Sequence, residues 1–215
     1  MKDLVIIGAG GFGSEVAIIV NEINDVEPTW NFLGYVDDAR TPGEITPEGY
    51  EVLGNLDYLL EREDKPYFTI AIANSEARER IAARCKAAGL PAATIIPHET
   101  IIGPCCVIGE GTIISRGVVL SAHVKLGAFC VLNSFCNIGH DAVVDDYTSI
   151  MSDSLIAGDT YIGKYNYFGL RCTMINGVKT TDHCTVGACA CVVKDAVEPG
   201  TYVGVPAKLI KPLKK

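Results

Sequence analysis

Large apolar residues recur every six positions through the second half of the chain. The series is Ile102, Ile108, Ile114, Leu120, Leu126, Leu132, Ile138, Val144, Ile150, Ile156, Ile162, Phe168 and Met174, and after Thr180 it resumes at Val186 and Val192. Two residues before each of these positions stands a small or β-branched residue, with Asn166 as the exception. Apolar positions of a helix recur at three and four residues, and those of a half-buried strand at two. A period of six predicts the hexapeptide repeat of a parallel β-helix.

The repeat also predicts the dimensions of this helix. Three hexapeptides close a triangular coil of about eighteen residues, and successive coils stack at roughly 4.8 Å. Glycine often follows the large apolar position, where the backbone must turn tightly; examples are Gly103, Gly109, Gly127, Gly139, Gly163, Gly169 and Gly187. Residues 100–196 therefore predict about five to six coils, a column roughly 25 Å tall.

The first part of the chain has a different pattern, in which apolar runs alternate with helical periodicity. An apolar run at Leu4–Ile7 leads into a glycine turn, and a helical pattern follows through Ile23. Two further strands, one ending at Asp38 and one over 68–73, alternate with two more helices, the last beginning at Asn74 or Ser75. We expect a Rossmann-like α/β domain over residues 1–93, a β-helix over 94–203 and a C-terminal tail over 204–215.

The glycine turn of residues 8–13 follows a strand and opens a helix. This arrangement leaves backbone N–H groups free at the helix N-terminus, where the partial positive charge suits a phosphate. Asp37 would fit the ribose of NAD, but the segment is too short for the two mononucleotide-binding halves of a full dinucleotide fold. A nucleotide or nucleotide-sugar is favoured, with NAD and a purely structural turn as the alternatives.

Charge and hydropathy exclude several classes of partner. The net charge of −8 argues against nucleic acid, whose binding depends on lysine and arginine at the phosphates. No apolar stretch reaches the eighteen or so residues of a membrane span, and the N-terminus lacks the features of a signal peptide. We expect a cytoplasmic protein that does not bind membranes. Lysines cluster only in the tail, where a solvated end is the simpler interpretation: Lys208, Lys211, Lys214 and Lys215.

The nine cysteines do not indicate a metal site. Five occupy the small inward position of the repeat, where a thiol acts as a small hydrophobe: Cys106, Cys130, Cys136, Cys172 and Cys184. Cys189 and Cys191 are two residues apart and Cys105 is adjacent to Cys106, so no pair has zinc-finger spacing. We expect no metal, and a nucleophilic cysteine is disfavoured because none has a histidine close in sequence.

His140 is the distinctive histidine among the four. It lies two residues after the inward Ile138, at a corner that points out of the column, and Asp141 follows immediately. A neutral imidazole oriented by a carboxylate is the arrangement that general-base catalysis requires. The alternative is a surface histidine with an acidic neighbour by chance. No two histidines lie within ten residues of each other, which disfavours a zinc site within one chain.

Several motifs together resemble one family, and the resemblance covers essentially the whole chain. They are Gly8–Gly13, Tyr35–Asp38, Phe68–Glu76, the hexapeptides, Gly139-His140-Asp141 and Val203–Lys208. The chain resembles the bacterial sugar acetyltransferases with an N-terminal nucleotide-binding domain and a left-handed β-helix. That group includes N-acetyltransferases of UDP- or dTDP-linked 4-amino-6-deoxy sugars and the sialic acid O-acetyltransferases.

The resemblance implies a homotrimer with acetyl-CoA as co-substrate and an active site in each groove between neighbouring columns. It implies that His140 is the catalytic base, that Asp141 raises its basicity, and that the sugar amine attacks the thioester directly. The positions matching the pantetheine site are Asn133, Ser149, Gly158, Leu170 and Ala188. Those matching the nucleotide-sugar site are Gly10, Gly11 and Phe12 at the phosphates, Asp37 and Asp38 at the base and ribose, and Ala73 and Asn74 at the facing strand end.

Two departures from the family pattern concern individual ligand contacts. Ser149 stands where several relatives have a histidine that contacts acetyl-CoA, and Phe12 stands where some have a histidine in the glycine turn. Three other functions remain open: O-acetylation of a free sugar such as sialic acid, a non-catalytic nucleotide-sugar-binding module, and an NAD-dependent dehydrogenase. The sequence does not identify the sugar, the nucleotide or the length of the acyl chain.

Overall fold

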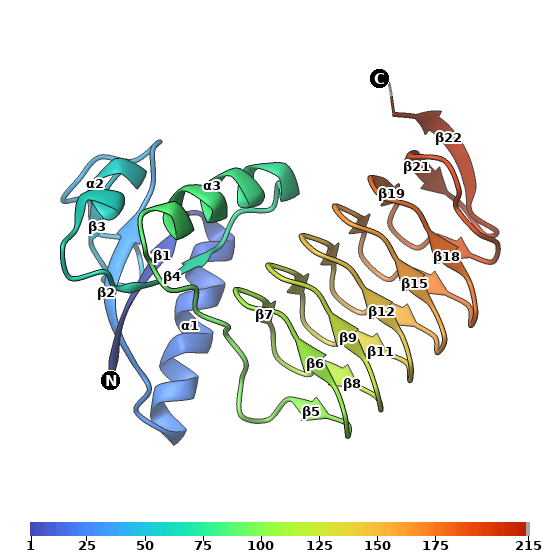
Figure 1. Cartoon of the computed structure of the whole chain (residues 1–215), viewed down its shortest axis with the longest axis horizontal. Coiled ribbons are helices and arrows are strands. Elements are labelled where there is room, and N and C mark those ends of the chain that lie inside the picture. Colours follow the sequence, from blue (N-terminus) through green and yellow to red (C-terminus); the bar gives the residue numbers. More distant parts are fainter. Residues whose placement is uncertain (214–215) are drawn as a thin grey trace. The chain divides into compact units, whose positions relative to one another are not determined.

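The computed structural model describes residues 1–213 and divides into two compact units (Figure 1). One unit is Met1–His98 and the other begins at Glu99. The last two residues of the expected tail, Lys214 and Lys215, lie outside the described residues. Among the described residues, no helix is long and apolar enough to cross a membrane.

The N-terminal unit is a four-stranded parallel sheet with three helices. Its elements are β1 (Lys2–Ile7), α1 (Gly11–Val26), β2 (Trp30–Val36), β3 (Val52–Gly54), α2 (Leu56–Glu61), β4 (Tyr67–Ile70) and α3 (Ser75–Ala87), and the strand order is β3-β2-β1-β4. A Cβ on Gly13 would lie 2.1 Å from the carbonyl oxygen of Gly8, so only glycine lets α1 start this close to β1. The Rossmann-like prediction is confirmed.

The second unit is a column of strands, most of them two residues long, joined by tight corners (Figure 1). The strands are β5 (Ile101–Ile102), β6 (Val107–Ile108), β7 (Ile113–Ile114), β8 (Val119–Leu120), β9 (Lys125–Leu126), β10 (Val131–Leu132), β11 (Asn137–Ile138), β12 (Val143–Val144), β13 (Ser149–Ile150), β14 (Leu155–Ile156), β15 (Tyr161–Ile162), β16 (Tyr167–Phe168), β17 (Thr173–Met174), β18 (Lys179–Thr180), β19 (Cys184–Val186), β20 (Cys191–Val192), β21 (Gly200–Val203) and β22 (Lys208–Pro212). They form three sheets, in the orders β22-β21-β19-β16-β13-β10-β7, β20-β17-β14-β11-β8-β5 and β18-β15-β12-β9-β6. Leu132 pairs in parallel with Ile150, one coil further on. The predicted β-helix is confirmed.

The two exceptions to the repeat are hydrogen-bonded to each other. Asn166 interrupts the series of small residues and Thr180 interrupts the series of large apolar ones. Both are buried, and the Asn166 amide donates to the Thr180 hydroxyl at 2.8 Å and to the carbonyl of Thr181 at 3.0 Å. A buried amide without hydrogen-bond partners is costly. The polar Asn166 in the series of small residues is therefore matched by the polar Thr180 in the series of large apolar residues.

The inward cysteines serve as packing residues. All nine cysteines are free, and burial raises the pKa of Cys136 to about 12 and that of Cys172 and Cys184 to about 11. A thiol with so high a pKa is almost entirely uncharged at neutral pH and is a poor nucleophile.

The structure places two boundaries differently from the sequence analysis. The first unit extends beyond residue 93 to His98, since Ala92 bridges β4 at Phe68 and the Ala93 N–H donates to the Phe68 carbonyl at 2.8 Å. At the other end, β22 pairs in antiparallel fashion with β21. The described part of the expected tail, 204–213, therefore contains a strand of the column sheet and is not a loose end.

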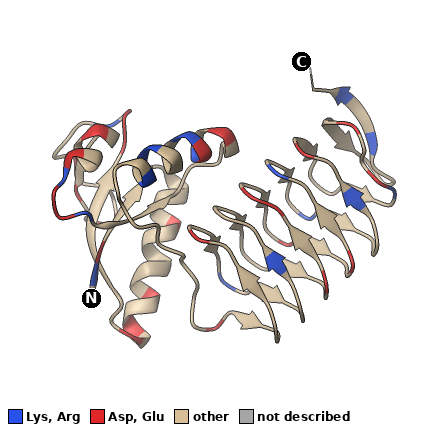
Figure 2. Ribbon diagram, in the orientation of Figure 1, with Lys and Arg blue, Asp and Glu red and all other residues tan. Residues whose placement is uncertain are grey.

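Charged side chains of both signs are spread over the two units (Figure 2). In α3 they follow the helix dipole, with Glu76 in the first turn and Arg84 and Lys86 in the last. Acidic groups near an N-terminus and basic groups near a C-terminus stabilise a helix.

Candidate active site

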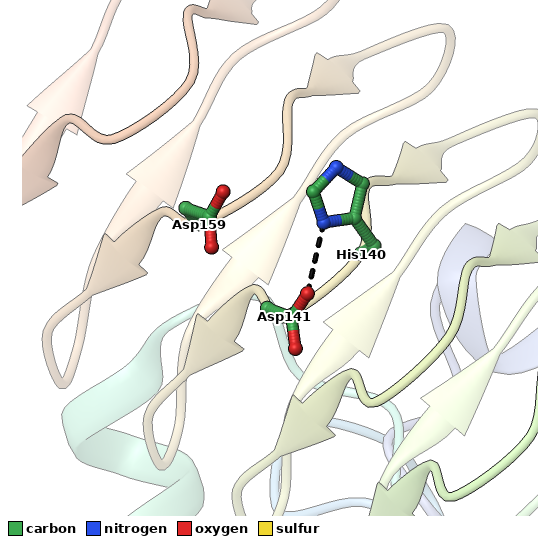
Figure 3. Close-up of side chains that lie close together, drawn as sticks. All are labelled: His140, Asp141 and Asp159. Atoms are coloured by element: carbon green, nitrogen blue, oxygen red, sulfur yellow. Dashed lines mark hydrogen bonds and ion pairs between the residues drawn. The ribbon is translucent and has the colours of Figure 1, made fainter.

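His140 and Asp141 lie at a corner of the column, between β11 and β12. The His140 side chain is 60% exposed and its Nδ1 lies 2.9 Å from Oδ2 of Asp141 (Figure 3). Asp141 has a left-handed backbone, with φ of 59°. The structure therefore brings together the two residues predicted to perform catalysis.

The surrounding charges make His140 a stronger base than an isolated histidine. The hydrogen bond to Asp141 raises the pKa of His140, and the negative charges of Asp159 and Asp141 raise it further. The same hydrogen bond lowers the pKa of Asp141, which remains a carboxylate. Because Nδ1–H donates to Asp141, Nε2 is left free to accept a proton from a substrate.

Gly158, on the next coil, lies against the His140 ring. A Cβ at this position would be 2.7 Å from both Cε1 and Nε2 of the imidazole, closer than any ordinary contact. The Asp159 N–H donates to the His140 carbonyl at 2.9 Å and fixes the stacking of the two coils. Gly158 is buried, and within residues 1–213 its N–H makes no hydrogen bond.

Two neighbours of the pair were not singled out from the sequence. His123 lies one coil before Asp141, with its Nδ1 3.1 Å from Oδ1 of that carboxylate. Asp159 lies one coil after, and its carboxylate is close to His140 without a hydrogen bond to it (Figure 3). The sequence could have indicated both neighbours, because a coil of eighteen residues places residues 123, 141 and 159 above one another.

The same cluster could offer ligands to a cation. One ligand atom each from His140, Asp141 and Asp159 lie within 4.8 Å of one another, and all three residues are exposed. A structural zinc site takes four protein ligands in a closed shell, whereas a catalytic site takes three and leaves one position open. The metal-free reaction expected from the sequence stays a prediction, which the removal of divalent cations tests.

The five residues expected at acetyl-CoA lie in different parts of the column. The stacked corners formed by residues 121–124, 139–142 and 157–160 make one edge of the column, which we call the His140 edge. Gly158 lies on this edge, as His140 does. Asn133, Leu170 and Ala188 belong to the corners 133–136, 169–172 and 187–190, which we call the Leu170 edge. The sheet of β8, β11 and β14 separates the two edges. Leu170 is exposed, whereas Ser149 in β13 is buried.

In the N-terminal unit, Asp37 and Asp38 line a cavity of about 180 Å³ together with Gly8 and Ile72. Both also bind the backbone. Asp37 accepts hydrogen bonds from the Ala9 and Ala39 N–H groups at 2.8 Å each, and Asp38 accepts one from the Leu56 N–H at 2.9 Å. These bonds fix the carboxylates at the rim of the cavity.

The expected phosphate turn is open at the N-terminus of α1. Gly10 caps the helix without a side-chain hydrogen bond, and a Cβ on Gly10 or Gly11 would meet nothing within 4 Å. Phe12 is half-buried in the first turn. An open helix N-terminus is compatible with a phosphate, since its N–H groups carry partial positive charge.

Ala73 and Asn74 lie between β4 and α3, both exposed. The Asn74 amide oxygen accepts from the Ala77 N–H at 2.7 Å, so this side chain is the N-cap of α3. The buried Arg78, which the sequence analysis did not single out, donates to the carbonyls of Ile72 at 2.9 Å and Ala73 at 3.0 Å. Arg78 therefore holds the chain that faces the glycine turn.

Comparison with known proteins identifies relatives of both units. Residues 3–85 match the PglD N-terminal domain. WeeI from Acinetobacter baumannii AYE is 28% identical, with a TM-score of 0.87 over 98% of this chain and 100% of its own. The acetyltransferase domain of PglB from Neisseria gonorrhoeae FA1090, solved with acetyl coenzyme A, is 26% identical, with a TM-score of 0.88 over 97% of this chain and 99% of its own.

A perosamine N-acetyltransferase from Caulobacter crescentus, solved with CoA and GDP-perosamine, has the same fold at 23% identity. Its TM-score is 0.88 over 98% of each chain. These comparisons confirm the two-part fold and the resemblance on which the sequence-based assignment rests.

Proposed function

We propose that this chain, a member of the sugar acetyltransferases that join a PglD N-terminal domain to a left-handed β-helix, acetylates the amino group of a nucleotide-linked sugar with acetyl-CoA. The observation that carries this proposal is the 2.9 Å contact between His140 and Asp141 at an exposed corner of that fold. It supplies a base whose pKa is raised and whose Nε2 is not engaged by Asp141. The cytoplasmic location expected from the sequence remains part of the proposal.

In the proposed reaction His140 acts as a general base. The sugar nitrogen attacks the thioester carbonyl of acetyl-CoA while Nε2 of His140 takes a proton from that nitrogen. The C–N bond forms, the C–S bond breaks, and the proton passes from His140 to the departing CoA thiolate. Asp141 stabilises the imidazolium formed between these steps. A general base with a pKa near the working pH contributes ~10²- to 10⁴-fold in rate.

The unused N–H of Gly158 supports a second role at the same corner. During the attack the carbonyl oxygen acquires negative charge, which a fixed N–H donor stabilises. Gly158 lies beside the His140 ring, where a side chain would collide with the imidazole. We assign Gly158 to the acetyl-CoA site for this reason.

The N-terminal unit is proposed to hold the nucleotide-sugar. Its phosphates would lie at Gly10, Gly11 and Phe12, where the N-terminus of α1 is open, and its base and ribose at the cavity lined by Asp37 and Asp38. Ala73 and Asn74 would face them from the end of β4. Our proposed substrates are UDP- or dTDP-linked 4-amino-6-deoxy sugars. Because the Caulobacter enzyme was solved with GDP-perosamine, a GDP-linked sugar belongs in the test.

The separation of the two edges supports a homotrimer. In one chain Asn133, Leu170 and Ala188 lie on the Leu170 edge, while His140 and Gly158 lie on the other side of a sheet. A pantetheine arm along the Leu170 edge of one column would reach His140 of a neighbouring column when columns stand side by side. Of the five residues, Ser149 and Gly158 are buried. Analytical ultracentrifugation measures the assembly directly.

The test of the proposed function follows thiol release from acetyl-CoA with UDP-, dTDP- and GDP-linked 4-amino-6-deoxy sugars and with free sialic acid. Mass spectrometry of the product and its resistance to mild alkali distinguish an amide from an ester. An amide formed on one nucleotide-linked amino sugar supports the proposal. An ester on sialic acid alone would reassign the protein as an O-acetyltransferase, and silence with nucleotide-sugar binding would favour the non-catalytic module.

A further inference from the structure

The Asp141 carboxylate contacts two histidines at once, one through each oxygen. Its Oδ2 lies 2.9 Å from Nδ1 of His140, and its Oδ1 lies 3.1 Å from Nδ1 of His123. All three side chains are half-exposed or more. The proposed mechanism uses His140 and Asp141 and leaves His123 without a role.

The backbone sets the register between His123 and Asp141. Both stand at the same position of successive coils and have left-handed backbones, with φ of 61° and 59°. The Asp141 N–H donates to the Ala122 carbonyl at 3.0 Å, and the His123 N–H donates to the Pro104 carbonyl at 2.9 Å. The stacked coils therefore hold the second imidazole over the carboxylate.

We propose that His123 is a positioning residue for His140: by donating Nδ1–H to Oδ1 of Asp141, it fixes the carboxylate plane so that Oδ2 remains directed at His140. The proposal rests on the proposed function for its kinetic consequence only. An exposed carboxylate with a single partner rotates freely about its Cβ–Cγ bond, whereas one held at both oxygens does not. The contact to His123 also lowers the pKa of Asp141, so the carboxylate remains charged.

The competing explanation is that the pair only ties two coils together. Lys164 and Asp146 form such a pair on another edge, also one coil apart, with Nζ 2.8 Å from Oδ2. Exposed pairs of this kind add little stability. A coil-stacking role would leave the basicity of His140 unchanged, whereas a positioning role would not.

Four titratable groups lie at the same corner of the column as the Asp141 carboxylate. His140 is its neighbour on the same coil, His123 lies on the coil before and Asp159 on the coil after. Cys105 occupies the equivalent position one coil before His123 and is exposed. These are the groups whose titration a pH experiment at this corner must separate.

Three variants of the full chain test the proposal. His123→Ala removes the N–H donor, and His123→Asn keeps a donor near the position of Nδ1 without a titrating ring. Asparagine also tolerates a left-handed backbone well. Lys164→Gln is the matched control, because it removes a coil-to-coil pair of the same spacing on a different edge.

The first readout is an NMR titration of the four imidazoles, which needs no substrate. We expect the pKa of His140 to fall in His123→Ala and to stay at the wild-type value in His123→Asn and Lys164→Gln. We also expect the neutral forms of His123 and His140 to carry the proton on Nδ1. An unchanged pKa of His140 in His123→Ala, or a rise in it, would overturn the proposal.

The second readout is the rate of acetyl transfer. We expect kcat of His123→Ala to fall about tenfold with KM values unchanged, and His123→Asn to retain most of the rate. A fall in both variants, or in neither, contradicts the positioning role. If the wild type transfers no acetyl group, the proposed function fails, and the titration still decides whether His123 positions Asp141.

Discussion

Replacing Gly158 with alanine tests the contact on which the geometry of the base depends. The added Cβ would lie 2.7 Å from Cε1 and Nε2 of His140, whereas ordinary carbon contacts begin near 3.4 Å. The backbone of the adjacent coils is fixed by hydrogen bonds, so the exposed imidazole must move by about 1 Å. A displacement of this size typically costs ~10²-fold in rate, which is about 2.7 kcal/mol in activation free energy.

Stability should not follow the rate in this variant. Gly158 does not have a left-handed backbone, so alanine is accommodated without strain in the main chain. Alanine also restricts the unfolded chain, which favours the folded state by about 0.4–1 kcal/mol. We expect an unchanged or slightly higher Tm together with the loss of activity.

The assay is thiol release at saturating acetyl-CoA and sugar, with an NMR titration of His140 alongside. Displacement of the base lowers kcat, whereas obstruction of the pantetheine arm raises KM for acetyl-CoA, and the two effects are separable. Wild-type kcat and KM in Gly158→Ala, at an unchanged Tm, would refute the assignment of this corner as the reaction centre.

Three further predictions concern other parts of the account. His140 must be unprotonated to act, and its hydrogen bond to Asp141 raises its pKa above that of an ordinary histidine. Wild-type activity should therefore fall as the pH decreases through this raised pKa. Asp141→Asn should move this limb of the pH–rate profile to lower pH, with a reduced kcat. Gly13→Ala should destabilise the N-terminal unit by more than about 2 kcal/mol in urea unfolding, since its Cβ would lie 2.1 Å from a backbone oxygen; a wild-type midpoint would contradict the packing of α1 on β1. Dialysis against EDTA should leave acetyl transfer unchanged, and an activity restored only by a divalent cation would make the cluster of His140, Asp141 and Asp159 a metal site.

Local patterns predicted the fold because each hexapeptide repeats the same packing requirement. The inward series from Ile102 to Val192 fixed the strand positions, and neighbouring residues such as His140 and Asp141 were found as a pair because the sequence places them together. The meaning of Asn166 and Thr180 was hidden, since their hydrogen bond joins two coils. The sequence shows that these residues break the repeat, and only the stacked coils show that each satisfies the other.

The sequence analysis missed two kinds of interaction: side-chain contacts between successive coils, and hydrogen bonds to the backbone. His123 and Asp159 are each about eighteen residues from the pair they approach, so they become visible only when the chain is aligned in whole coils. Asn74 was expected at the substrate and is also the N-cap of α3. β22 was expected to be a loose tail because its lysines suggested solvent, whereas its backbone pairs with β21. A strand at the end of a sheet tolerates such charged side chains.

The most direct test of the central claim compares wild type with His140→Ala in acetyl transfer to the preferred amino sugar, with acetyl-CoA binding measured separately. The His140 side chain is 60% exposed, so its removal should leave folding intact. We predict a fall in kcat of at least ~100-fold, as expected for the loss of a general base. A variant that retains kcat within threefold of the wild type would show that His140 is not the base.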